Sequence, residues 1–98
     1  MEWAMPWKPL TCEDAEVYEN QLPKEVSYTP SHPLHGVVAH AIGIRQDWQD
    51  ILFELEGSEY RYAVVHLTWR GGLPDTRLYK DASEVQQMIK DDSEEYGD

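Results

Sequence analysis

The chain has 98 residues, eight of them lysine or arginine and nineteen aspartate or glutamate, which gives a formal net charge of −11. A chain of this length forms one domain, and its negative charge argues against direct binding to nucleic acid or to anionic membranes, which both attract basic surfaces. Cys12 is the only cysteine, so an intramolecular disulfide is excluded. Together with the lack of a signal-peptide pattern at the N-terminus, this predicts a cytoplasmic protein.

Residues 1–10 contain Trp3, Trp7 and two prolines, and because proline interrupts a helix, this segment is predicted to be an irregular arm. Its two tryptophans are expected either to pack onto the domain or to contact a partner. A helix is predicted to begin after Thr11, whose hydroxyl can cap a helix with acidic residues in its first turn. Pro23 limits this helix, with an extension of about three residues left open.

Four extended segments follow the helix. Residues 37–44 are nearly all apolar, as expected for a strand that is covered on both faces. Residues 50–56 alternate apolar and polar side chains, which predicts a strand with one solvent-exposed face. Residues 60–69 are predicted to form the central strand, and residues 76–80 a short last strand after a loop at 70–75.

The turn before the central strand determines which residues share a face of the sheet. Gly57-Ser58 is a two-residue hairpin signal. This turn, or a four-residue loop with the same register, pairs Phe53 with Tyr62. His66 then lies on the face that carries Phe53, whereas Asp50 points to the opposite face. The predicted register therefore leaves His66 without an acidic partner.

The C-terminal part of the chain is predicted to form a second helix and a tail. Asp81 can cap a helix whose Glu84 reaches back to it. Residues 91–98 include five acids and are predicted to be a disordered acidic tail. The predicted fold is a single α+β domain over residues 1–90. It has an antiparallel sheet of three to four strands, with an N-terminal and a C-terminal helix packed on one face.

The histidines are the first candidates for chemistry. His32 and His35 have the spacing of a metal-ligand pair, but Pro33 keeps them off a common helical face and no second pair follows, so neither a metal site nor a cofactor is predicted. His66 could act as a general base near neutral pH. It lacks a nucleophile and an orienting acid, so we predict that it is a hydrogen-bonded residue of the sheet. No residues form a catalytic signature.

The tryptophans are candidates for a binding surface, because tryptophan is enriched among the residues that dominate interface affinity. Trp48 lies in a polar turn between two predicted strands and is the first candidate for an exposed anchor. Trp3 and Trp7 come next. Trp69 falls among the core-facing positions of the central strand, so a structural role is predicted for it.

Three segments resemble a family of small uncharacterised bacterial proteins: His32-Pro33-Leu34-His35-Gly36, Asp50-Ile51-Leu52-Phe53 and Ala63-Val64-Val65-His66-Leu67-Thr68-Trp69. The similarity spans about residues 15–90, and the last segment is its most recognisable part. The family pattern has a pair of acids before the Leu-Phe step, where this chain has Gln49 and Asp50. The resemblance implies a single compact domain and carries no known activity.

The acidity and the missing catalytic signature predict a non-enzymatic protein-binding module for a basic partner, such as an inhibitor, antitoxin or immunity-type protein. Excess negative charge speeds the encounter with a cationic protein. Two alternatives remain open. One is a small hydrolase that is metal-dependent or uses His66, and the other is a homodimeric structural or regulatory subunit.

Overall fold

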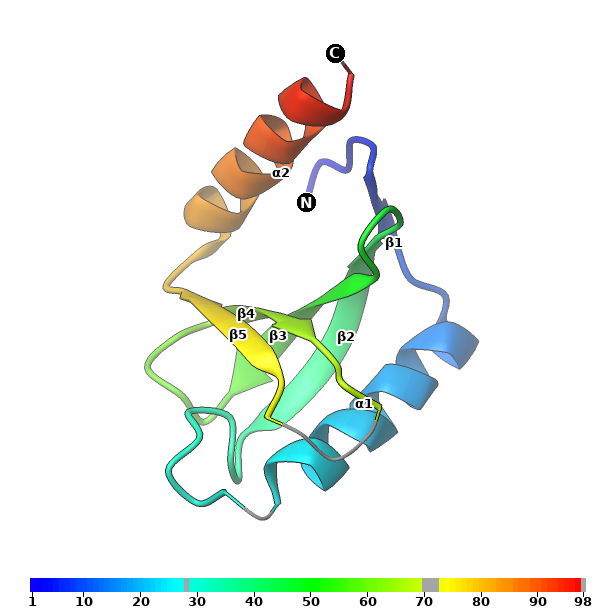
Figure 1. The fold of residues 1–98 in the computed structure, drawn as a ribbon. Coiled ribbons are helices and arrows are strands. Elements are labelled where there is room, and N and C mark those ends of the chain that lie inside the picture. The colour runs from blue at the N-terminus through cyan, green and yellow to red at the C-terminus, as the bar shows by residue number, and fades with distance from the viewer. Residues whose placement is uncertain (28, 70–72, 98) are drawn as a thin grey trace.

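The computed structural model describes residues 1–27, 29–69 and 73–97 and shows an antiparallel sheet with two helices (Figure 1). Its elements in chain order are β1 (Trp7–Pro9), α1 (Cys12–Val26), β2 (Val38–Arg45), β3 (Asp50–Glu56), β4 (Tyr62–His66), β5 (Asp75–Tyr79) and α2 (Ala82–Tyr96). The strands follow one another across the sheet in the order β1-β2-β3-β4-β5. The α+β class is confirmed, with five strands instead of three to four. Part of the predicted loop, at 70–72, lies outside the described residues.

The additional strand is β1, which lies within the segment that was predicted to be an irregular arm. Trp7 pairs with Arg45 and Pro9 pairs with Gly43 of β2. Proline is compatible with a short strand at the edge of a sheet, because the N–H that it lacks is not needed for a ladder on the outer side. The prolines of this segment therefore excluded a helix without excluding a strand.

The two helices cover opposite faces of the sheet (Figure 1). α1 packs on the face that carries Phe53 and Val65, and α2 packs on the face that carries Leu52 and Val64. The prediction that both helices lie on one face is therefore wrong. Residues 51–53 are consecutive and all fully buried, so both faces of β3 need an apolar cover, and one helix supplies each.

A buried carboxylate joins α1 to the chain that leaves β4. Glu25 is 4% exposed, and its Oε1 accepts hydrogen bonds from the backbone N–H and the hydroxyl of Thr68, at 2.8 and 3.0 Å. Its Oε2 accepts from the Trp69 N–H at 3.0 Å and from Gln21 Nε2 at 2.9 Å. Burial raises the pKa of Glu25, but these hydrogen bonds outweigh burial and hold the pKa below its ordinary value.

We expect Glu25→Gln to destabilise the fold by about 1.5–3 kcal/mol at neutral pH, because the new NH₂ group faces only hydrogen-bond donors. The folded-state pKa of Glu25 is lowered, so its contribution is present above the unfolded-state pKa and is lost as pH falls through the folded-state pKa. The difference between the two proteins, measured by urea unfolding, should therefore shrink in acid. Glu16→Gln, on an exposed position of α1, is the control and should change stability by less than about 0.5 kcal/mol.

α2 includes most of the segment that was predicted to be a disordered tail. Asp81 caps the helix as predicted, and the helix continues to Tyr96. Asp92 Oδ2 accepts a hydrogen bond from Trp7 Nε1–H at 2.8 Å and lies 3.4 Å from a guanidinium nitrogen of Arg45. The apolar periodicity of the helix ends before these turns. The periodicity therefore did not indicate that polar contacts hold the last turns of α2 against the sheet.

Replacing Asp92 by Ala should destabilise the protein by about 1–3 kcal/mol, because it removes the acceptor of the Trp7 indole N–H and one carboxylate partner of buried Arg45. Glu95→Ala removes the same charge from an exposed position of the same helix and should cost less than about 0.5 kcal/mol. Thermal unfolding of both variants measures the difference. Equal effects of the two substitutions would mean that Asp92 acts only through its charge.

Candidate functional site

The pairing of β3 with β4 differs by one residue from the prediction, since Phe53 pairs with Ala63 instead of Tyr62. The Leu55 N–H donates to the Arg61 carbonyl, and the five residues enclosed by this pair, 56–60, are one more than in the longer of the two predicted turns. Because side chains alternate between the two faces, a shift of one residue exchanges the faces of one strand relative to its neighbour. His66 therefore shares its face with the acid that begins β3 and not with Phe53.

One residue from each strand contributes to a row of side chains that crosses the whole sheet on the face that α2 contacts. Trp7 of β1 pairs with Arg45, Arg45 with Asp50, and His66 with Asp75, while Asp50 and His66 are joined by a hydrogen bond. We call these five residues the cross-strand row. From Arg45 to Asp75 the row alternates basic and acidic side chains, and such directly opposed pairs stabilise a sheet.

Asp50 is the buried centre of the cross-strand row, with 5% of its surface exposed. Its Oδ1 lies 2.8 Å from His66 Nδ1, and its Oδ2 lies 3.8 Å from a guanidinium nitrogen of Arg77. A carboxylate oxygen only accepts hydrogen bonds, so the hydrogen of this pair is on Nδ1 and a lone pair is left on Nε2. The His66 side chain is 55% exposed, so this Nε2 side of the ring is open to solvent.

Arg45 holds the next part of the site in place. Its Nε donates to Asp47 Oδ1 at 2.9 Å, and the centre of its guanidinium lies 4.4 Å from the centroid of the Trp48 ring. Burial lowers the pKa of Arg45, but the hydrogen bond with Asp47 and the charges of Asp92, Asp47 and Asp50 outweigh burial and raise the pKa above its ordinary value. A permanent cation therefore packs against one face of the Trp48 ring.

A hollow of about 620 Å³ opens on the same face of the sheet. Val64 and His66 of β4 line it together with charged residues of the neighbouring strands, and Trp48 forms a wall. The complete lining consists of Trp48, Asp50, Val64, His66, Asp75, Thr76 and Arg77. This hollow combines a histidine held by a buried acid, an exposed guanidinium and an aromatic surface, and it is the candidate functional site.

The tryptophans that were considered as anchors differ in their exposure to solvent. Trp48 is 61% exposed, in agreement with its predicted placement in a turn. Trp7 is 1% exposed and packs beneath α2, so its side chain does not face a partner in this fold. The core position predicted for Trp69 is wrong. β4 ends at His66, and Trp69 adopts a positive φ of 61° that ends the strand alternation and leaves it 52% exposed.

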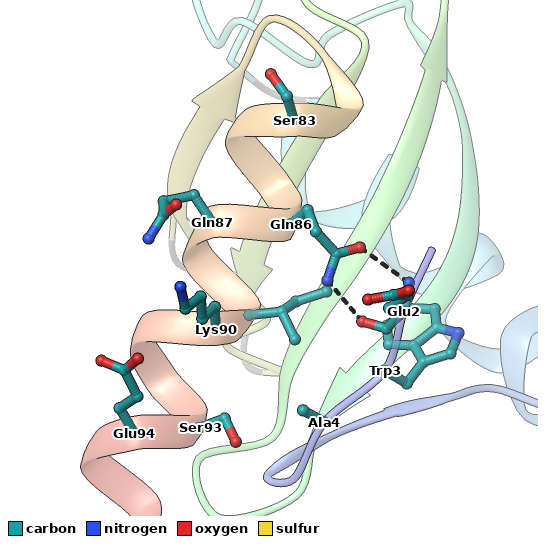
Figure 2. Close-up of a pocket in the computed structure, with 10 residues that line it drawn as sticks. Glu2, Trp3, Ala4, Ser83, Gln86, Gln87, Lys90, Ser93 and Glu94 are labelled. Carbon is teal, nitrogen blue, oxygen red and sulfur yellow. Dashed lines mark hydrogen bonds between the residues drawn. The ribbon is translucent and has the colours of Figure 1, made fainter.

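Trp3 lies in a second hollow, of about 540 Å³, between the N-terminal arm and α2 (Figure 2). The Gln86 side chain holds the arm there, since its Oε1 accepts from the Glu2 N–H at 2.9 Å and its Nε2 donates to the Glu2 carbonyl at 2.8 Å. The Trp3 ring also covers Gly43, where any side chain would overlap it. Trp3 and Trp7 therefore both pack onto the domain.

The early histidines serve separate local contacts. His32 Nδ1 accepts from the Leu34 N–H at 3.1 Å, and His35 Nδ1 lies 3.0 Å from the Val26 carbonyl. His40 is exposed, and its hydrogen bond with Glu56 raises its pKa. Within residues 1–27, 29–69 and 73–97, no three histidine, cysteine or acidic side chains are grouped as metal binding requires.

Comparison of the chain with protein-family models, curated proteins and solved structures gives no match. Within the described part of the chain, neither helix is long and apolar enough to cross a membrane.

We expect NMR spectra of the imidazole nitrogens to show neutral His66 with its hydrogen on Nδ1, because Asp50 accepts there. His32 is the internal control with the opposite tautomer, since its Nδ1 accepts a backbone hydrogen bond. Asp50→Asn should weaken the Nδ1–H preference of His66 and leave His32 unchanged. A neutral His66 with its hydrogen on Nε2 would contradict the geometry of the pair.

Proposed function

We propose that this protein is a cytoplasmic protein-binding module that neutralises a basic partner, as an inhibitor, antitoxin or immunity-type protein does. The observation that carries the proposal is the exposed Trp48 ring, which stands at the wall of the candidate site with one face against the Arg45 guanidinium. Tryptophan is enriched among interface hot spots because it buries a large area with few rotatable bonds.

The surroundings of Trp48 support its role as an anchor. The guanidinium of Arg45 is itself buried and bonded to Asp47, so the ring is held in one orientation before a partner arrives. Preorganisation of this kind lowers the entropy that binding removes. Asp75 also lines the hollow beside Trp48. The anchor therefore lies among carboxylates that a lysine or arginine of the partner can meet.

The net charge of −11 supports a basic partner. Long-range attraction between opposite charges speeds association and is screened by salt, whereas packed contacts such as an aromatic anchor mainly set the dissociation rate. The two features predict separable effects on binding kinetics.

The test is biosensor kinetics on the partner that is captured by the full chain and identified by mass spectrometry. Trp48→Ala should speed dissociation by about 30-fold, which corresponds to a hot spot of about 2 kcal/mol, and leave association nearly unchanged. Trp69→Ala is the matched control, because Trp69 is a tryptophan of similar exposure, and it should change neither rate.

Raising the salt concentration from low to well above physiological should slow association by about tenfold and change dissociation much less. An acidic partner, or an association rate that does not depend on salt, would disprove electrostatic attraction. Equal effects of the two tryptophan substitutions would disprove the role of Trp48 as an anchor.

A further inference from the structure

We propose that the His66–Asp50 pair also gives the protein a hydrolytic activity, in which His66 Nε2 is the general base that activates water against a small, uncharged ester in the hollow. This activity belongs to the free protein, since it needs only the pair, the hollow and solvent. The inference is based on the observed register of β3 and β4. This register places Asp50 beside His66 and so supplies the orienting acid that a histidine base requires.

A second histidine of the same sheet shows what distinguishes His66. Both imidazoles have a carboxylate within hydrogen-bond distance, at 2.8 Å for His66 with Asp50 and 3.1 Å for His40 with Glu56. Their side chains are similarly exposed, at 55% and 48%. The carboxylates differ, because Asp50 is buried whereas Glu56 is largely exposed. A buried partner fixes the tautomer and orientation of the ring, and an exposed, mobile partner does so only weakly.

The lining of the hollow indicates the class of substrate. Trp48 offers an aromatic wall on which a planar group can lie, and Arg77 brings an exposed guanidinium beside the pair. A guanidinium can stabilise the negative charge that develops on a carbonyl oxygen. The charge of −11 repels anionic substrates such as phosphodiesters. A neutral ester with an aromatic group therefore suits the site best.

The attacking group is water. The only hydroxyl in the described lining belongs to Thr76, and it donates to the Pro74 carbonyl at 3.2 Å. His66 Nε2 takes a proton from water as the water oxygen bonds to the ester carbon, and the carbonyl π pair moves to oxygen as an oxyanion near Arg77. Collapse of the oxyanion breaks the bond to the leaving oxygen, which receives the proton from Nε2. One ester and one water thus give one acid and one alcohol or phenol.

The experiment measures hydrolysis of 4-nitrophenyl acetate by the purified full chain. The rate of the unmodified protein should rise as the pH is raised from acid, because only a neutral imidazole can act as a base. His66→Gln should lower kcat/KM by about 100-fold or more and remove this rise. Asp50→Asn should cause a smaller loss. Arg77→Gln should lower kcat more than it changes KM.

The matched control is His40→Gln, which should keep the full rate and the pH profile. Melting curves should confirm that the exposed His66→Gln variant is folded, and mass spectrometry during turnover should show no acetylated protein. Unchanged hydrolysis in His66→Gln, or equal losses in the two histidine variants, would overturn the proposal. Accumulation of acetyl-His66 would show a nucleophile instead of a base and would overturn it as well.

Discussion

The carboxylate of Asp50 is buried within the sheet, and the polar residues around it are arranged to offset the cost of removing that charge from water. A buried carboxylate without partners is strongly destabilising. Here Arg45 stands opposite it on β2, His66 bonds to it from β4, and Arg77 approaches from β5. The same Arg45 packs against Trp48. One buried charge thus connects the register of three strand pairs with the orientation of the exposed tryptophan.

Apolar periodicity was sufficient to predict the helices, the middle strands and the α+β class, because these elements are defined by which side chains they bury. It was insufficient for the β3–β4 register. Both strands carry apolar residues on both faces, so Ile51 meets a valine whether it pairs with Val64 or with Val65. The polar ends of the strands distinguish the two registers, because only the observed one places Asp50 beside His66. A register chosen to place Asp50 beside His66 is the observed one.

Other differences between the predictions and the structure have a similar origin, because the spacing of apolar residues in a sequence gives no information on polar contacts. The last turns of α2 carry acids and were predicted to be disordered, yet Asp92 bonds to Trp7. Trp69 continues the alternation of β4 in the sequence, but the hydrogen bonds of Glu25 to the following backbone draw the chain out of the strand. The exposure of Trp48 was predicted correctly, because its turn is polar and has no apolar pattern that would place it in the core.

The contacts between the two ends of the chain affect the order in which the fold can assemble. Every strand pairs with its neighbour in sequence. The strands β2 to β5 are joined by short loops, whose closure costs little entropy and favours rapid folding, whereas α1 lies between β1 and β2. The bonds from Glu2 to Gln86 and from Trp7 to Asp92 instead join positions 84 and 85 residues apart. The sheet can therefore form before α2 docks. At that stage the cross-strand row is complete from β2 to β5, while Trp7 at the other end of the row is not yet covered by α2.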